Sequence, residues 1–560
     1  MTARSLPLDP DTADDDLTSA SSTARDSMTV GLWTAVGRAT GVIRVIVIGA
    51  VLGPTFFGNA FQLTNTLPNL IFYGFLAGSL LASLLVPALV RYIDDGRPEE
   101  TARVSGGFLG VALMALLMAA PVAVLVLPLL LRLGTLGQST PMVDDQMFQI
   151  RLLLVLAVPQ VFLYALIASA TAVSYAHRRY TLAAAAPAVE NLGVIAVLAA
   201  VAVIYGVEHS DAAAVPTGEL LLLGLGSTAA VALHASVQWW GARRFGVSIR
   251  PRNGWRDPEV RTVIRRASRS LVQSGLLAVQ VLVLLVLASR VAGGTVAMQI
   301  SFNFYHLPLA LAAAPVALAL LPRLARLQEP GQSSSFADAY IRAVALAVFL
   351  VTPAAFGYVV LSGALAHSIA AGQMASSAGI AMVAGSLAAI AVGLVGETFF
   401  VVSTQAAYSR GDAGMPLVSM GLQALVCVAL ALPVLFIDGE RVVTLLGGAY
   451  AVAALVGGLH LFARIRRSCG PSAERLWPSM LRIAVAVAVM VPVVHLSASL
   501  ATSAVDGRAG WILAVLAGSL TGALAYGLTH LLLRSSELSW LLDGLRKKKA
   551  GAPVTEGEAT

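Results

Sequence analysis

The sequence predicts an all-α polytopic membrane protein with fourteen transmembrane helices, arranged as two pseudo-symmetric six-helix lobes plus two C-terminal helices. Three observations lead to this fold class: an extremely apolar composition, apolar segments that fill almost the whole chain, and an internal repeat. Apolar residues make up 57% of the 560 residues, charged residues make up 12%, and the mean hydropathy is +0.80. Soluble domains carry roughly twice that share of charge, so we expect a chain that is embedded in a membrane.

Fourteen apolar segments are each long enough to cross a bilayer as a helix. About 20 apolar residues span the hydrocarbon core, and a helix satisfies its own backbone hydrogen bonds where water is absent. The predicted spans are residues 30–51, 66–90, 104–131, 151–176, 182–206, 217–241, 268–289, 296–321, 338–361, 376–407, 415–437, 442–463, 478–499 and 510–533.

The arginines lie almost entirely in every second gap between these spans. The even-numbered gaps hold twenty-one arginines, whereas the odd-numbered gaps and their borders hold five. Because basic loops stay on the cytoplasmic side, the pattern predicts that the even gaps and both chain ends are cytoplasmic. We therefore attribute the net charge of +7 to topology and to anionic lipid headgroups, and we expect no nucleic-acid partner.

Short sequence matches recur at a nearly constant separation of 233 to 240 residues, which covers six spans. An even number of spans gives both copies the same orientation, and such parallel repeats are typical of transporters whose two lobes rock about a central site. The matching pairs are Leu67-Pro68 with Leu307-Pro308, Pro87 with Pro322, and Tyr175 with Tyr408.

These patterns divide the chain into six parts. The first 28 residues are polar and acidic, which is typical of a disordered segment. The expected parts are a disordered cytoplasmic tail (1–28), an N-terminal lobe (29–244), a basic cytoplasmic linker (245–267), a C-terminal lobe (268–467), a pair of extra helices (476–534) and a cytoplasmic tail (535–560).

The sequence has no motif that indicates an enzyme. It lacks a phosphate-binding glycine loop, a cluster of metal ligands and a nucleophile elbow. Its two cysteines, Cys427 and Cys469, support neither a disulfide nor a zinc site. We therefore expect a transporter without cofactor or metal, driven by an ion gradient, the membrane potential or the gradient of its substrate.

Two arginines lie inside the first span, where an unpaired charge costs several kcal/mol. Arg38 and Arg44 are six residues apart, which separates them by about 120° around a helix. One interpretation is that they face a cavity and bind a phosphate, because the guanidinium fork matches phosphate oxygens. The other is that each side chain extends to the lipid headgroups at one membrane surface.

Three further ionisable residues in the spans are candidates for coupling or charge balance. Glu190 is either a structural carboxylate hydrogen-bonded to neighbouring helices or a functional group, namely a counter-ion to Arg38 or Arg44 or a protonatable coupling group; Glu397 has the same interpretations. His306 is either a packing residue or a proton relay. A polar set at the second span either lines a vestibule or caps a helix, and consists of Asn59, Gln62, Asn65 and Asn69.

Several motifs resemble the MurJ/MviN family of lipid II flippases, in the MOP exporter superfamily. The resemblance covers most of residues 30–467, and the first-span motif is its most specific part. The motifs are residues 38–44 (RATGVIR), Leu52-Gly53, residues 59–61, residues 67–70 (LPNL), Gly78, Val86-Pro87, residues 175–191 and residues 408–416.

The resemblance implies two lobes around a cavity, with Arg38 and Arg44 as contacts for a lipid diphosphate. It also implies that the helices over 476–534 form a groove for the polyprenyl tail. Asn65, Asn69 and Asn303 are further candidates for substrate binding. Other charges of the family are replaced, which makes this chain a divergent member: Asn59 stands for an acidic residue, Phe72 and Tyr73 for a basic one, Ala77 for a glutamate and Asn303 for a basic one.

The leading hypothesis is a flippase of the bacterial inner membrane that moves an undecaprenyl-diphosphate-linked sugar, such as lipid II, to the outer leaflet by alternating access. The alternatives are a MATE-like antiporter for cations or drugs, an exporter of another polysaccharide lipid, and a non-transporting scaffold for envelope-synthesis proteins. The seventh and eleventh spans contain no acidic residue, so the sodium site of some relatives is not expected.

Overall fold

The computed structural model describes residues 10–72, 85–132, 140–207, 215–327 and 333–541. Within these ranges twelve helices are long and apolar enough to cross a membrane, and no residue is in a β-strand. A further span is a helix pair that is bent by 45°, α13 (Ser377–Ala391) followed by α14 (Gly393–Ser409). The predicted second span falls partly on residues 73–84, outside the described residues. The all-helical membrane fold is confirmed, and its span count is consistent with fourteen.

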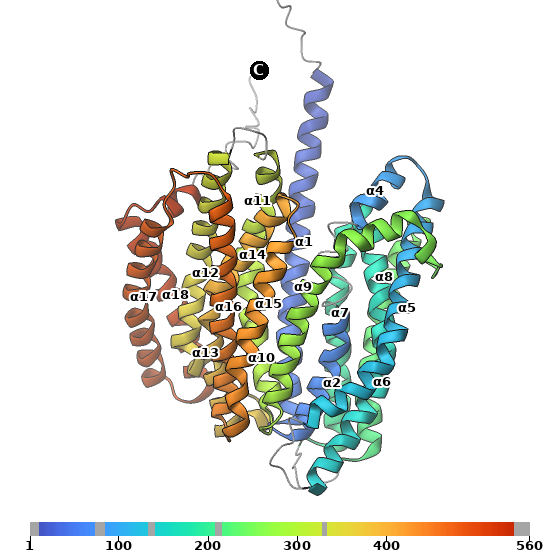
Figure 1. Cartoon of the computed structure of the whole chain (residues 1–560). Helices are drawn as coiled ribbons and strands as arrows, with labels where there is room; N and C mark the ends of the chain where they lie inside the picture. Colours follow the sequence, from blue (N-terminus) through green and yellow to red (C-terminus); the bar gives the residue numbers. More distant parts are fainter. Residues whose placement is uncertain (1–9, 73–84, 133–139, 208–214, 328–332, 542–560) are drawn as a thin grey trace, which may run out of the picture.

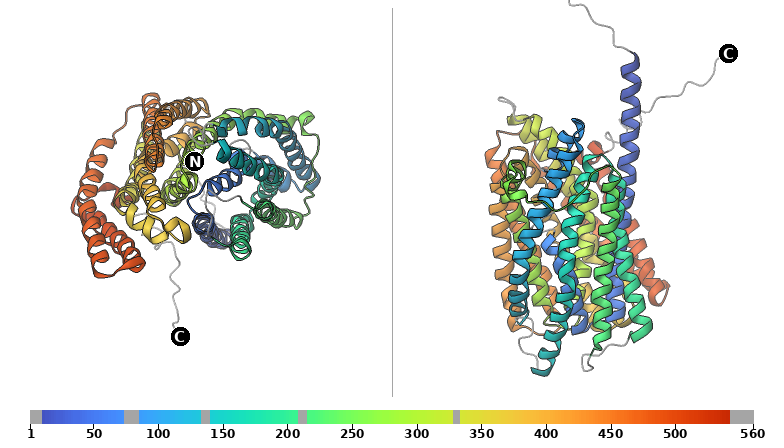
Figure 2. Two further views of the ribbon diagram at one scale, coloured as in Figure 1. Left: turned by 90° about the horizontal axis from the view of Figure 1, so that it is seen from below. Right: turned by 90° about the vertical axis from the view of Figure 1, so that its right-hand side faces the viewer.

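The helices of the two halves form two groups that stand side by side (Figures 1 and 2). The N-terminal lobe contains α1 (Pro10–Leu52), α2 (Phe56–Phe72), α4 (Val86–Asp94), α5 (Pro98–Leu131), α6 (Thr140–Ala176), α7 (Tyr180–Tyr205) and α8 (Thr217–Arg243). The C-terminal lobe contains α9 (Pro258–Ala288), α10 (Gly294–Pro308), η5 (Leu309–Ala313), α11 (Ala314–Arg326), α12 (Ser333–Ile369), η6 (Gly372–Ala375), α13, α14, α15 (Gly414–Ala431), η7 (Leu432–Phe436) and α16 (Arg441–Ser468).

The two lobes repeat one packing pattern. In the N-terminal lobe α1 packs on α7, α7 on α8, and α6 on α8; in the C-terminal lobe α9 packs on α15, α15 on α16, and α14 on α16. Each pair in the second lobe follows its counterpart by six spans, as the sequence repeat predicts. The predicted pseudo-symmetry is thus confirmed at the level of helix packing.

Two additional helices cover one edge of the C-terminal lobe. α17 (Leu476–Ala504) and α18 (Gly507–Leu532) pack against each other and against α12. They lie at the outer margin of the molecule, away from the N-terminal lobe (Figure 2). α1 begins and α18 ends on the same side of the molecule (Figure 1), as an even number of spans requires. We call this the basic side, because α4, η4 (Gly254–Arg256) and the start of α9 bring arginines to it, and the opposite side the far side.

Helix α9 connects the lobes and contacts both of them. Its first turns lie against α5 and η4 of the N-terminal side, and its later turns pack on α15. Glu259 accepts a hydrogen bond at 2.8 Å from Arg91 in α4, and Asp257, the N-cap of α9, pairs with Arg103 in α5. Both ion pairs are partly exposed, so each contributes little on its own. Together they fix the start of α9 to the N-terminal lobe.

Two chain divisions differ from the sequence-based expectation. The segment 10–28 was expected to be disordered, but it forms the first part of α1, which begins at Pro10. The sequence after Pro10 has no proline or glycine before Gly31, so nothing interrupts the helix that continues from the apolar span. The basic linker is also shorter than residues 245–267, because Asp257 and Pro258 are favourable N-cap and N1 residues and start α9 there.

Candidate functional site

The lobes are joined at the far side by the side chain of Asn59, near the start of α2. Its Nδ2 donates to the carbonyl of Val291 at 2.7 Å and reaches the carbonyl of Ser289 at 3.4 Å, and its Oδ1 accepts from the backbone N–H of Thr295 at 2.9 Å. One amide thereby satisfies backbone groups in the loop after α9 and in the first turn of α10. The polar set around α2 was expected to line a vestibule or cap a helix; Asn59 accepts from an N–H at the start of α10 and so joins the two lobes.

The backbones of the two lobes approach closely around this junction. The N–H of Gly293 donates to the carbonyl of Thr55, and Gly293 has a φ of +75°. A Cβ on Gly293 would lie 2.3 Å from the Cα of Pro54. Only glycine permits both the left-handed backbone and this contact, so the junction depends on Gly293.

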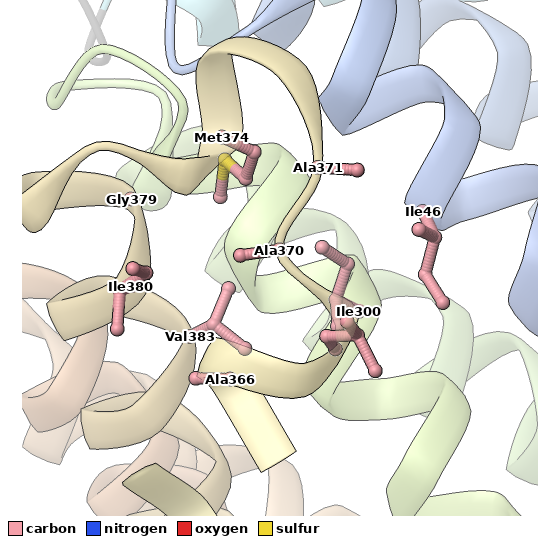
Figure 3. A pocket seen from close by; sticks show the side chains of 10 residues that line it. Ile46, Ile300, Ala366, Ala370, Ala371, Met374, Gly379, Ile380 and Val383 are labelled. Carbon is pink, nitrogen blue, oxygen red and sulfur yellow. The ribbon is translucent and has the colours of Figure 1, made fainter. Parts of the chain in front are cut away.

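Apolar side chains fill the adjoining space between the lobes. Ile46 of α1 faces a small cavity whose other walls come from the C-terminal lobe (Figure 3). The cavity has a volume of about 10 Å³, close to the smallest space that holds one water molecule, and its apolar lining gives a water no partner. The lining residues are Ile46, Ile300, Ala366, Ile369, Ala370, Ala371, Met374, Gly379, Ile380 and Val383. The far side is therefore closed by dry packing as well as by hydrogen bonds.

A buried polar cluster lies in the N-terminal lobe around Glu190 of α7. Its Oε1 accepts a hydrogen bond from the hydroxyl of Tyr164 at 2.7 Å and lies 3.5 Å from Nη1 of Arg44. Its Oε2 lies 2.7 Å from Nδ1 of His234. The side chains of Arg44 and Glu190 are 16% and 8% exposed, so this ion pair is largely shielded from solvent. Glu190 thus has hydrogen-bond partners on the neighbouring helices α6 and α8 and also lies beside Arg44, so its contacts agree with both a structural carboxylate and a counter-ion.

The second arginine of α1 has a different environment. Arg38 is exposed, and its charge acts on His306 of α10, in the other lobe. The ring of His306 is exposed as well and stacks on Phe302 at a centroid distance of 6.2 Å. Arg38 and His306 thus lie on different lobes, close enough for the charge of Arg38 to act on the imidazole, on the basic side of the closed junction.

The C-terminal lobe holds a second buried carboxyl group, Glu397 of α14. It is 8% exposed and lies beside Gln423 of α15, and its charge acts on Tyr305 and Tyr450. The Oε2 atom of Glu397, the hydroxyl of Tyr305 and both amide atoms of Gln423 are buried without a hydrogen-bond partner among the described residues. This cluster differs from the one around Glu190 because no arginine pairs with its carboxyl group in the described part of the chain.

Among the described residues, no hydrogen bond links the three asparagines predicted to bind substrate. Asn65 and Asn69 are half-buried on α2, and Oδ1 of Asn69 is buried without a partner in the described part of the chain. Asn303 is half-buried on α10, where its Nδ2 donates to the carbonyl of Gln299 in the same helix at 2.8 Å.

On the basic side, Arg323 and Arg326 of α11 line an open cleft of about 460 Å³ with Ala319, Leu327 and Ser335.

The sequence profile of the family described as "Lipid II flippase MurJ" matches residues 48–533, most of the chain. The chain belongs to the MurJ family of lipid II flippases. Two relatives named "Probable lipid II flippase MurJ" are 25% identical over 440 residues (Rhizobium tropici; 79% of this chain, 80% of the relative) and 27% identical over 441 residues (Rhizobium meliloti strain 1021; 78% and 79%). MurJ proteins are transporters rather than enzymes, and this member is a multi-pass membrane protein of a family that resides in the bacterial inner membrane.

The fold agrees with this assignment. A solved structure titled "Lipid II flippase MurJ, inward closed conformation" superposes with a TM-score of 0.69 at 14% identity, over 91% of this chain and 100% of that one. A MATE-family multidrug transporter of the MOP superfamily in an inward-facing conformation has a TM-score of 0.60 at 13% identity, over 77% and 94%. The MurJ resemblance inferred from the sequence is confirmed, and the MATE neighbour shares the fold.

Two members of the cluster in this MurJ chain escaped sequence reasoning. Tyr164 and His234 both contact Glu190, yet neither belongs to a recognisable motif. A polar residue in an apolar span is the only signal that they give. Their pairing depends on how α6 and α8 are rotated about their axes, which hydropathy does not specify.

Proposed function

We propose that this MurJ chain moves an undecaprenyl-diphosphate-linked sugar, the peptidoglycan precursor lipid II, from the inner to the outer leaflet by alternating access. The arginine-rich loops support a cytoplasmic location for the basic side and for both chain ends. The far side then faces outward, and the junction at Asn59 is the gate that closes it.

The observation that carries this proposal is the position of Arg38 and His306 on opposite lobes, inward of the closed gate. Charged and polar groups that lie close to each other on two lobes imply a hydrated chamber, because each would be costly against lipid. An anionic headgroup that enters from the basic side meets Arg38 first and Arg44 about two turns deeper along α1.

In this proposal Arg38 and Arg44 hold the diphosphate. A guanidinium carries five N–H donors, and Nε of Arg44 is buried with no hydrogen-bond partner among the described residues, so the ion pair with Glu190 leaves donors for phosphate oxygens. Glu190 balances the charge of Arg44 while the chamber is empty. Asn65, Asn69 and Asn303 supply neutral hydrogen-bonding groups, and Glu397 and His306 are the remaining candidates for coupling transport to an ion gradient.

The polyprenyl tail stays in lipid, and we assign its guidance to α17 and α18. The outer face of α18 carries a continuous row of exposed leucines, which suits a hydrocarbon chain. These residues are Leu513, Leu516, Leu520, Leu524, Leu528 and Leu531.

The test is transport of labelled lipid II in proteoliposomes by the Arg44→Ala variant. We expect the rate to fall about tenfold or more, because a hydrogen bond to a charged group contributes about 1.5–3 kcal/mol. Arg44→Lys keeps the charge but loses the planar guanidinium fork, so its transport rate should lie between those of the wild type and Arg44→Ala. Arg151→Ala, which removes an exposed arginine of α6, is the matched control. Wild-type transport by Arg44→Ala would refute the role of Arg44.

The rival functions predict different results in the same vesicles. A MATE-like antiporter would be inhibited or driven by an organic cation and would be indifferent to the lipid headgroup. A scaffold for envelope-synthesis proteins would tolerate all substitutions between the lobes while depending on its cytoplasmic loops. For a flippase, Arg44→Ala lowers the rate of lipid II transport, and the activity depends on the lipid diphosphate.

A further inference from the structure

The carboxylate of Glu190 is shared between two basic groups on different helices. Arg44 of α1 lies at 3.5 Å from Oε1, and Nδ1 of His234 of α8 lies at 2.7 Å from Oε2. The short contact between His234 and the carboxylate requires a proton between them. The side chains of His234 and Glu190 are 6% and 8% exposed, so water does not replace either partner.

The imidazole has one nitrogen left over. If Nδ1 carries the proton that bonds to Glu190, then Nε2 of a neutral ring is a bare acceptor. Nε2 of His234 is buried and has no hydrogen-bond partner among the described residues. A second proton there would give an imidazolium in direct contact with the carboxylate of Glu190.

The charge of the cluster depends on that proton. With a neutral ring, Arg44 and Glu190 cancel, and the cluster has no net charge. With a protonated ring, the imidazolium neutralises Glu190 and the positive charge of Arg44 is left uncompensated. The groups that face the pair from the helices packed around it are Tyr164 of α6 and Arg44 of α1, while α7 and α8 supply Glu190 and His234 themselves.

We propose that Glu190 and His234 form a proton-binding site whose occupancy is linked to binding of a lipid diphosphate at Arg44. The proposal rests on the role of Arg44 given above. A proton on the pair releases Arg44 to bind an anion, and by reciprocity an anion at Arg44 strengthens proton binding. His234 is here a positioning residue: it acts on the substrate through Glu190 and Arg44.

The experiment measures binding of lipid II, whose diphosphate is esterified at both ends and does not itself titrate near neutral pH, to the full chain in nanodiscs between about pH 5.5 and pH 8.5, the range in which histidines titrate. For the wild type we expect the affinity to fall as pH rises, by at most about tenfold per pH unit for one linked proton. His234→Gln keeps an N–H donor for Glu190 but cannot bind the proton, so its affinity should be nearly independent of pH. His460→Gln is the matched control, because His460 bonds to Ser419 in the other lobe.

Calorimetry in two buffers of different ionisation enthalpy gives a second, direct readout. The wild type should take up a fraction of a proton as the diphosphate binds, and His234→Gln should take up none. The proposal is overturned if His234→Gln keeps the pH dependence or the proton uptake of the wild type. It is also overturned if the wild type shows neither a pH-dependent affinity nor proton uptake. Arg44→Ala separates the proposed function from the proposed proton site. If Arg44→Ala binds the lipid as the wild type does, the proposed function fails. If Arg44→Ala loses binding while the affinity of His234→Gln still depends on pH, only the proton site is refuted.

Discussion

Tyr164 and Glu397 occupy equivalent positions in the two lobes, 233 residues apart. Tyr164 in α6 donates to Glu190 in α7, and Glu397 in α14 lies beside Gln423 in α15, which follows Glu190 by the same 233 residues. Within the repeat, the buried carboxyl group therefore lies on different helices in the two lobes: on α7 in the N-terminal lobe and on α14 in the C-terminal lobe. In the N-terminal lobe it is paired with Arg44, and in the C-terminal lobe it has no such partner in the described part of the chain.

Because of this difference, two matched substitutions should have unequal effects on the stability of the protein. Glu190→Gln leaves the charge of Arg44 buried without a counter-ion and should destabilise the protein by about 3 kcal/mol or more. Glu397→Gln removes a carboxyl group that has no arginine partner among the described residues, and should change stability by less than about 1 kcal/mol or raise it. Thermal unfolding in one detergent compares the two variants, and equal losses would show that the lobes do not differ in this way.

The closed junction on the far side can be trapped by a disulfide. A Cβ on Gly49 would lie 3.5 Å from the Cβ of Met374, within the range of disulfides. Gly49→Cys with Met374→Cys, in a background where Cys427 and Cys469 are serine, should crosslink and stop lipid II transport until a reductant is added. Each single cysteine variant is the control. Oxidised double-cysteine protein that still transports would exclude an opening at this junction.

The hydrogen bonds of Asn59 predict that a negative charge at this position weakens the junction between the lobes. Its amide donates to the carbonyl of Val291 and accepts from the N–H of Thr295, whereas an ionised aspartate only accepts. Asn59→Asp should lose the donated bond and repel the carbonyl, so crosslinking of the Gly49 and Met374 cysteine pair should be slower by about tenfold, the equivalent of 1.4 kcal/mol. Asn303→Asp, on α10, controls for an added charge near the chamber. Unchanged crosslinking in Asn59→Asp would remove Asn59 from the gate.

Cys469, after α16, gives a prediction about reactivity on the basic side. Burial raises the pKa of its thiol, and the nearby charges of Arg410 and Arg466 oppose that shift. Because the thiolate is the reactive form and a raised pKa lowers its share at neutral pH, maleimide labelling should be slower than for a free cysteine and should rise as pH rises. In a Cys427→Ser background, Arg410→Ala should slow labelling further. Faster labelling in Arg410→Ala would contradict the assigned sign.

The sequence predicted the spans and the lobes well, because a bilayer sets a minimum length for each helix and a parallel repeat must preserve orientation. It also predicted Glu190 as one possible counter-ion to Arg44. It did not predict His234 as a partner, because that contact depends on helix rotation. The part played by Asn59 was missed for a related reason: contacts between lobes are set by how two finished bundles dock, which no local pattern encodes.

The groups that join the lobes around Asn59 are all uncharged: one side-chain amide, three backbone carbonyls and two backbone N–H groups. Dissolved ions screen attraction between charges and have little hold on neutral dipoles at short range. The junction on the far side should therefore hold as firmly at low ionic strength as at high ionic strength.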